Sequence, residues 1–274
     1  MDDEYSQPVP AYLNPRFVES RDGRPIRILS EYLEPAARFR RYEVSDTIVF
    51  YGSARIVSRE QAEKMLNAAR VHKGDVAAAE RALDMSRYYE DARELAHRLT
   101  DWSKSLEGTE RRFVVCTGGG PGIMEAANRG ASEAAGMNVG LNIKLPFEQH
   151  ENPHITRELT FEFNYFFMRK FWFMYLAKTL VIFPGGFGTL DELFEAMTLV
   201  TTGKLHKKMP VILYGTDYWD DVMDLDAMVR HGTILPDELD AVFRTNSVDD
   251  AFNHITRELT DLFLEEPGGR RELA

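Results

Sequence analysis

The sequence predicts an α/β fold in which a doubly wound, mostly parallel sheet forms a single domain with an N-terminal extension. Short apolar runs alternate along the chain with longer amphipathic stretches, which is typical of strands connected by helices. Three of those runs lead into glycine-containing turns, at residues 52–55, 118–122 and 184–189. In doubly wound sheets, turns at the carboxyl ends of the strands form the edge that binds ligands.

The composition and net charge of the chain disfavour several classes of function. The 274 residues are 44% hydrophobic and 28% charged, which is typical of a soluble globular protein. The net charge of −11 disfavours nucleic-acid and anionic-membrane binding, because both need a basic face. No apolar run approaches the roughly 20 residues of a membrane span. The single cysteine, Cys116, and the absence of an apolar leader segment lead us to expect a cytoplasmic protein.

The first 45 residues differ from the rest of the chain. Residues 1–27 are rich in proline and charge, which indicates an arm, and a helix is expected at residues 28–41. We therefore divide the chain into an N-terminal arm and helix, residues 1–45, and an α/β domain, residues 46–274.

Strands and helices of the domain follow from the apolar pattern. Strands are predicted at residues 47–51, 112–117, 138–143, 159–163, 179–183, 210–214 and 241–244. Helices are predicted at residues 58–105 (two helices broken near Gly74), 123–135, 164–177, 190–202, 218–230 and 248–264. Because each strand is separated from the next by a crossover, the strands are expected to run parallel.

The two glycine clusters do not match known nucleotide fingerprints. Neither has G-x-G-x-x-G spacing, and the chain lacks G-x-x-x-x-G-K-[ST], so a nucleoside triphosphatase is disfavoured. Either cluster alone could be only a tight connection. Together, at strand ends that should be adjacent, they suit a phosphate held by backbone N–H groups of two loops. Arg55, after the first strand, could close on a phosphate or a base, or be a surface charge.

Glu192 has two interpretations. Thr189 and Glu192 fit the T-x-x-E capping box, in which the acid only caps a helix. However, a carboxylate beside a bound phosphate would repel it. If the loop binds a phosphate, Glu192 is better explained as facing a ribosyl oxocarbenium, the cation formed when a C1′–N bond breaks.

The predicted helix at residues 164–177 is aromatic nearly all round, with Arg169 and Lys170 as its only charges. Both side chains could simply extend from an apolar helix towards solvent. A buried arginine needs an anion, however, either Glu192 or a ligand phosphate. One chain is not expected to bury this helix, so we expect a homodimer or a higher homo-oligomer through residues 164–177.

Other chemistry lacks support in the sequence. The seven histidines show no metal-ligand spacing, so no metal site is predicted. The chain has no G-x-S-x-G elbow, and Cys116 lies on a predicted buried strand, which disfavours nucleophilic serine or cysteine catalysis.

These residues resemble the Lonely Guy (LOG) family, long labelled as possible lysine decarboxylases. The family signature P-G-G-x-G-T-x-x-E is met in full by residues 184–192, and Arg169-Lys170 matches the Arg-Lys pair upstream of it. Gly52-Ser53 and the triple-glycine loop at residues 118–124 also match, so the resemblance spans about residues 46–230.

The resemblance implies a Rossmann-like nucleotide-binding domain that forms a homodimer and needs no cofactor. It implies hydrolysis of the N-glycosidic bond of a nucleoside 5′-monophosphate to a free base and ribose 5-phosphate. The substrate would be a cytokinin riboside monophosphate or AMP, with Arg169 and Glu192 as catalytic residues. The expected substrate-binding residues are Gly52, Ser53, Arg55, Gly118, Gly119, Gly120, Gly122, Met124, Lys170, Gly185, Gly186, Gly188 and Thr189.

The chain also departs from the family pattern. Phe166 and Phe167 stand where the family usually has a Met-His pair, and the N-terminal extension marks a longer form. The alternatives are a non-catalytic carrier of a nucleotide or of molybdenum cofactor on the same fold, and a structural oligomer with a degenerate site. No lysine lies in a recognisable pyridoxal phosphate context, so decarboxylation is disfavoured.

Overall fold

The computed structural model describes residues 9–106, 108, 111–145, 152–205, 208–240 and 242–264. These residues contain one sheet of seven strands in the order β4-β3-β2-β1-β5-β6-β7, and all neighbouring strands are parallel. The strands are β1 (Thr47–Tyr51), β2 (Val114–Thr117), β3 (Asn138–Ile143), β4 (Thr160–Phe163), β5 (Ala177–Ile182), β6 (Val211–Tyr214) and β7 (Val242–Thr245). The predicted α/β fold with a doubly wound parallel sheet is confirmed.

The strand order explains where a ligand site forms. The chain starts at the central strand β1, continues outward through β2, β3 and β4, and then crosses back to β5 on the other side of β1. The connections therefore reverse direction between β1 and β5. Such a switch point leaves a crevice at the carboxyl ends of the strands.

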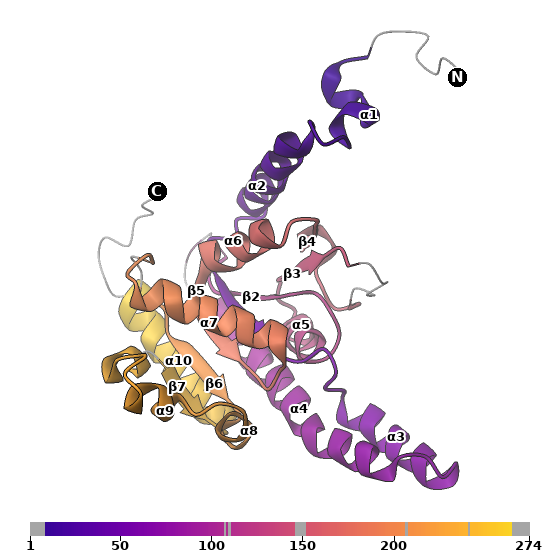
Figure 1. Ribbon diagram of the computed structural model, residues 1–274, viewed down its shortest axis with the longest axis vertical. Coiled ribbons are helices and arrows are strands. Elements are labelled where there is room, and N and C mark those ends of the chain that lie inside the picture. The colour runs from indigo at the N-terminus through magenta and orange to yellow at the C-terminus, as the bar shows by residue number, and fades with distance from the viewer. Residues whose placement is uncertain are drawn as a thin grey trace.

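Helices cover both faces of the sheet (Figure 1). The α-helices are α1 (Pro15–Val18), α2 (Arg24–Arg41), α3 (Arg59–Val71), α4 (Val76–Ser105), α5 (Ile123–Glu133), α6 (Phe166–Leu176), α7 (Phe187–Thr201), α8 (Thr216–Val222), α9 (Leu225–Arg230) and α10 (Val248–Phe263). Short 3-10 helices are η1 (Ala11–Leu13), η2 (Arg157–Leu159) and η3 (Pro236–Leu239). Buried residues of α4, α5 and α10 pack on one face of the sheet, and those of α2, α6, α7 and α8 on the other.

The alternation of side chains along β1 shows why its whole sequence is apolar. Ile48 and Phe50 belong to the core under α4, α5 and α10. Val49 and Tyr51 belong to the core under α6 and α7. A central strand covered on both faces needs a continuous apolar run, because successive side chains point to opposite faces.

Helix α2 supports the start of α6. The side chain of Glu31 accepts hydrogen bonds from the amides of Asn164 (2.9 Å) and Tyr165 (3.2 Å), and its carbonyl accepts one from Trp172 Nε1 (2.9 Å). The carboxylate thus satisfies amides just before α6, where helices carry unpaired donors. In Figure 1, α1 and the first part of α2 extend away from the sheet.

Three predicted helix boundaries were wrong. The helix expected from residue 28 starts at Arg24, inside the predicted arm. The single helix expected at residues 218–230 is two helices, because Met223 is extended and the Asp224 side chain caps α9 by accepting from Ala227 N at 2.7 Å. The helix expected from residue 190 starts instead at Phe187, inside the glycine turn. Residues 1–8 of the predicted arm, residue 241 of the last predicted strand and the terminal segment from residue 265 lie outside the described residues.

Candidate functional site

The three glycine-containing turns meet at the carboxyl ends of the adjacent strands β2, β1 and β5. The backbone of Ser53, after β1, connects them. Ser53 N donates to Pro184 O at 2.9 Å, and Ser53 O accepts from Ile123 N at 3.1 Å. The turn after β1 is therefore hydrogen-bonded both to the turn after β5 and to the first residue of α5.

Two glycines of the triple-glycine loop have conformations that other residues rarely adopt. Gly119 has φ +72° and Gly122 has φ +73°. A Cβ at Gly119 would overlap the side chain of Asn142, and one at Gly122 would overlap the carbonyl of Ser53. Both positions therefore need glycine for backbone conformation as well as for space.

A buried polar network, which was not predicted from the sequence, supports the same loop. Thr117 Oγ1 accepts from Gly119 N (2.9 Å) and donates to Asn128 Oδ1 (2.6 Å). Asn152 donates from its amide side chain to both Asn128 Oδ1 (3.0 Å) and Gly120 O (3.1 Å). The Gly119 amide, one of the expected phosphate donors, is thus already hydrogen-bonded within the loop. An asparagine on the apolar side of α5 was the sequence signal that could have revealed this network.

The capping-box interpretation of Glu192 was wrong. Because α7 begins at Phe187 with Gly186 as its N-cap, Thr189 lies inside the helix and Glu192 falls in its second turn. No side chain caps this helix. Glu192 therefore does not satisfy the amides at the start of α7, and its presence needs another explanation.

The amides that begin α7 are positioned for an anion. Those of Phe187, Gly188 and Thr189 belong to the first turn, where a helix offers no backbone acceptor. A Cβ at Gly186 or Gly188 would meet no heavy atom within 4 Å, so this side of the turn is open. The side chain of Thr189 is buried, and its hydroxyl lies against Gly185, where a Cβ would overlap it.

Glu192 is a buried acid with one unsatisfied oxygen. The residue is 6% exposed, and its Oε2 atom has no hydrogen-bond partner among the described residues. Lys170 Nζ lies 3.6 Å from Oε2, beyond hydrogen-bond distance. Burial raises the pKa of Glu192 to about 6, against the opposing effects of Lys170 and Arg169. Glu192 is therefore charged at neutral pH but close enough to its pKa to exchange a proton.

Arg169 holds its guanidinium beside the triple-glycine loop. Its Nε donates to Leu141 O at 2.7 Å, and its guanidinium carbon lies 5.1 Å from the centre of the Phe173 ring. A Cβ at Gly118 would overlap an Arg169 terminal nitrogen, so glycine there makes room for the arginine. Burial lowers the pKa of Arg169, and the charge of Glu192 opposes this shift. A guanidinium remains cationic even so.

Lys170 is engaged by carboxylates of α7. Its Nζ lies 2.6 Å from Glu195 Oε2 and 2.7 Å from Asp191 Oδ2, as well as close to Glu192. Burial acts to lower the pKa of Lys170, but the hydrogen bonds to Asp191 and Glu195 outweigh it and raise that pKa. Lys170 therefore links α6 to α7 beside the acid, and its expected contact with substrate stays a prediction.

The remaining predicted residues lie at the edge of this cluster. Gly52 follows β1, and a Cβ there would overlap Ile123 at the start of α5. The sulfur of Met124 lies against Gly118. Arg55 is exposed, and its backbone amide donates to Ser53 Oγ at 3.1 Å.

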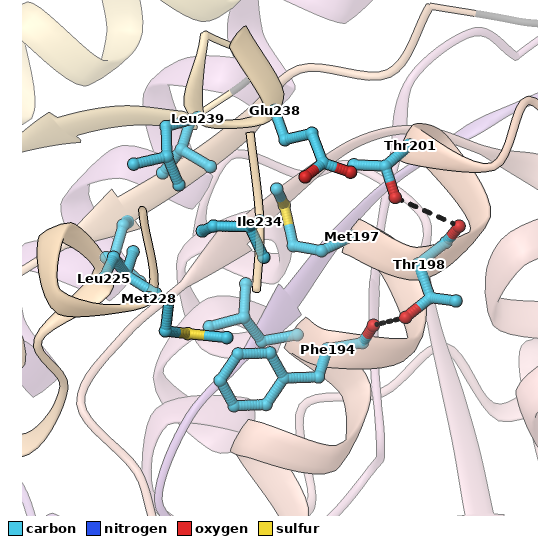
Figure 2. A pocket seen from close by; sticks show the side chains of 12 residues that line it. Phe194, Met197, Thr198, Thr201, Leu225, Met228, Ile234, Glu238 and Leu239 are labelled. Atoms are coloured by element: carbon cyan, nitrogen blue, oxygen red, sulfur yellow. Dashed lines mark hydrogen bonds between the residues drawn. The ribbon is translucent and has the colours of Figure 1, made fainter. Parts of the chain in front are cut away.

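A separate apolar cavity of about 160 Å³ lies along α7 (Figure 2). Phe194 and Met197 of α7 face Met228 and Ile234 across it. Its lining residues are Leu193, Phe194, Met197, Thr198, Thr201, Leu213, Leu225, Met228, Ile234, Glu238, Leu239 and Val242. No glycine-turn residue and neither proposed catalytic side chain lines it. No sequence pattern indicates this cavity, because it depends on how α7 packs against segments far along the chain.

No described helix is long and apolar enough to cross a membrane. Over the same residues, no three His, Cys, Asp or Glu side chains are grouped so that they could hold a metal ion.

Comparison with known proteins found one family model that matches part of the chain, and several solved structures that are similar to it. The family model described as "Possible lysine decarboxylase" matches residues 124–255, and no curated protein matches the chain. Among solved structures, the X-ray structure of TM1055 is 24% identical and covers 77% of this chain and 99% of its own, with a TM-score of 0.47. The molybdenum cofactor binding protein from Rippkaea orientalis is 18% identical and covers 63% of this chain and 88% of its own, with a TM-score of 0.45.

A third similar structure is the molybdenum cofactor carrier protein from Chlamydomonas reinhardtii. It is 18% identical and covers 79% of this chain and 99% of its own, with a TM-score of 0.46.

The fold is that of a Rossmann-like α/β protein, and its three glycine-containing turns lie at the carboxyl ends of β2, β1 and β5, the edge that we call the binding edge. The match over residues 124–255, which contains the triple signature of Arg169-Lys170, the glycine turn and Glu192, confirms the resemblance to the LOG family.

Proposed function

We propose that this protein is a phosphoribohydrolase that cleaves the N-glycosidic bond of a nucleoside 5′-monophosphate to give a free base and ribose 5-phosphate. The observation that carries the proposal is Glu192, a buried acid with an unsatisfied oxygen on the helix whose first amides form the glycine turn. A buried carboxylate oxygen without a hydrogen bond is costly, and a carboxyl group with a raised pKa is typical of sites that do chemistry.

The phosphate would bind at the start of α7. The amides of Phe187, Gly188 and Thr189 and the dipole of α7 would attract it, and the half-buried Arg169 would add a full positive charge. The open space at Gly186 and Gly188 supports a close approach of phosphate oxygens to the backbone.

Glu192 would act at the sugar. As the C1′–N bond breaks, its electron pair leaves with the base and positive charge develops on the ribose, where an adjacent carboxylate is stabilising. A water molecule then adds to C1′ and gives a proton to Glu192, while the departing base takes up a proton from the solvent. A pKa of about 6 leaves this acid ionised at neutral pH yet more basic than an ordinary glutamate. No metal or redox cofactor enters this scheme.

Turnover of AMP and of a cytokinin riboside monophosphate tests the proposal. We expect wild-type protein to release the free base, measured by chromatography, and Glu192→Gln to lose at least about a hundredfold in kcat. Asp191→Asn is the matched control, because this acid on α7 also contacts Lys170 but is exposed to solvent. Equal rates for wild type and Glu192→Gln would refute the role of Glu192, and tight nucleotide or pterin binding without release would favour a carrier.

We also propose that α6 mediates self-association. Phe166 and Phe167 are 53% and 51% exposed, and Phe171 and Tyr175 on the same helix are partly exposed as well. Exposed aromatic residues grouped in this way are typical of interfaces. Since α6 also carries Arg169, a second copy packed there would stabilise the helix that positions the arginine. A cytoplasmic enzyme fits the single cysteine, Cys116, which is free and buried.

A further inference from the structure

Tyr218 joins helix α8 to the glycine turn after β5. Its hydroxyl donates a hydrogen bond to the carbonyl of Gly185 at 2.9 Å. Helix α8 follows β6, and β6 is the neighbour of β5 on the side away from β1. Burial raises the pKa of Tyr218, so the phenol keeps its proton at neutral pH and stays a donor. The chemistry proposed for Glu192 and Arg169 does not involve this contact.

The neighbours of Tyr218 fix the position of its ring. Trp219, the next residue, is fully buried, and its Nε1 donates to Tyr214 O at 2.9 Å. The rings of Tyr218 and Trp219 pack edge-on with 5.0 Å between their centres. Directly before α8, a Cβ at Gly215 would approach Pro184 to 3.0 Å, so this helix begins against the glycine turn. An element anchored in the core therefore presents the hydroxyl to the turn.

Two successive carbonyls of the turn are held from opposite sides. Ser53 N, after β1, donates to Pro184 O at 2.9 Å, whereas Tyr218, after β6, donates to Gly185 O. Because β5 lies between β1 and β6, the two carbonyls point to different neighbours. The described residues contain no cis peptide bond. In a trans peptide the C=O and N–H groups point in opposite directions, so the amide of Gly186 points away from Tyr218 and towards the β1 side.

The β1 side of the turn is the side of the binding edge. The strands β1 and β2 follow there, and the guanidinium of Arg169 lies against Gly118, directly after β2. Gly186 is exposed and is the N-cap of α7, and a Cβ there would meet no heavy atom within 4 Å. The amide of an N-cap residue has no acceptor within its own helix. The Gly186 amide is therefore a further donor beside the first three amides of α7.

The peptide between Gly185 and Gly186 needs a partner that holds it, because glycine lies on both sides of it. Turning this peptide over changes only ψ of Gly185 and φ of Gly186, and glycine accepts both signs of φ. In the turned state, the carbonyl oxygen would face the binding edge in place of the N–H group and repel a phosphate. Gly185 is buried, so its carbonyl without the Tyr218 hydroxyl would lack a donor, which favours the turned state.

We infer that Tyr218 is a positioning residue that fixes the Gly185–Gly186 peptide so that its N–H group points at the phosphate of the ligand. This inference rests on the proposed function, in which a phosphate monoester binds at the start of α7. Tyr218 itself does not touch the substrate and takes no part in breaking the C1′–N bond. It acts on phosphate binding and leaves the chemistry at the sugar to Glu192.

The variant Tyr218→Phe tests the inference, because it removes only the hydroxyl and keeps the ring against Trp219. Tyr214→Phe is the matched control, since Tyr214 ends the adjacent strand β6 but its hydroxyl donates to Asp91 Oδ2 (3.0 Å) on the other face of the sheet. With AMP as substrate, we expect Tyr218→Phe to raise KM at least about tenfold and to change kcat less than about twofold. Tyr214→Phe should keep both values. An unchanged KM in Tyr218→Phe, or an equal loss in both variants, would overturn the inference.

Binding of ribose 5-phosphate tests the peptide separately from turnover. In protein labelled with nitrogen-15 at glycine, we expect this ligand to move the amide proton resonance of Gly186 downfield in wild type and Tyr214→Phe, but not in Tyr218→Phe. Calorimetry should show at least about tenfold weaker binding in Tyr218→Phe. If wild-type protein releases no base from AMP, the hydrolase proposal fails, but this arm still decides whether Tyr218 orients the amide. A Gly186 resonance that moves equally in wild type and Tyr218→Phe, or in neither, would overturn the inference.

Discussion

Replacing Glu192 with glutamine should stabilise the protein while abolishing turnover. Burial raises the pKa of Glu192 from 4.5 to about 6, which means that the folded protein prefers the neutral acid. Below the pKa that Glu192 has in the unfolded chain, the group is neutral in both states and its burial costs no stability. Above its pKa in the folded protein, the full cost of burying the charge lowers the free energy of unfolding. At about 1.4 kcal/mol for each pKa unit, this cost is about 2 kcal/mol at pH 8 and less than about 1 kcal/mol at pH 5.

Glutamine resembles the neutral acid in size and shape, so Glu192→Gln should recover most of this energy. We expect its free energy of unfolding in urea to exceed that of wild type by about 2 kcal/mol at pH 8, and by a smaller margin at pH 5. Protein concentration must be fixed, because an oligomer gains apparent stability by mass action. The control Asp191→Asn, an exposed acid on the same helix, should show no such gain.

The dependence on pH is the decisive part of this experiment. A stability gain of equal size at pH 5 and pH 8 would point to improved packing rather than to a removed charge. A variant less stable than wild type at pH 8 would show that the pairing of Glu192 with Lys170 and Arg169 outweighs its burial. Either result would refute the view that the fold holds this carboxylate at a cost in stability for the sake of its chemistry.

Further predictions address the rate, the loops and the surface. Because the carboxylate of Glu192 must be ionised, the rate should rise about tenfold from pH 5 to pH 7 in a pH–rate profile, and a flat profile would contradict this. Gly119→Ala should destabilise the protein by about 1–3 kcal/mol in urea unfolding, since φ is +72° and Asn142 blocks the methyl group. Gly188→Ala should leave stability intact but weaken nucleotide binding in calorimetry, because the methyl group enters the open side of the turn. Replacing Phe166 and Phe167 with serine should lower the mass measured by light scattering, if α6 mediates self-association.

The sheet could be predicted from the sequence because each strand is apolar enough to be buried on both faces. The predicted limits of β1 at residues 47–51 and β3 at residues 138–143 agree with the structure. The ends of the helices were harder to predict than the strands, because local sequence patterns there can indicate the wrong first residue. Thr189 with Glu192 has the pattern of a capping box, yet α7 starts at Phe187, since the glycines before it allow the backbone to enter the helix earlier.

The sequence indicated an anion near Arg169, and the charge of Glu192 does act on that guanidinium, while Lys170 Nζ lies 3.6 Å from Glu192 Oε2. The catalytic and binding roles of these residues stay predictions. The network of Asn128 and Asn152 could not be predicted, because the two residues contact each other only after α5 and the segment before β4 have packed together.

The hydrogen bonds of Ser53 with Pro184 and Ile123 have a consequence for the substitutions that this position can accept. Both are made by main-chain atoms, so they survive any substitution that keeps the local backbone path. A substitution at position 53 therefore removes the hydrogen bond from Arg55 N to Ser53 Oγ but leaves the turn after β1 bonded to Pro184 and to Ile123. The side chain at this point of the edge can change without loosening the connection between the three turns.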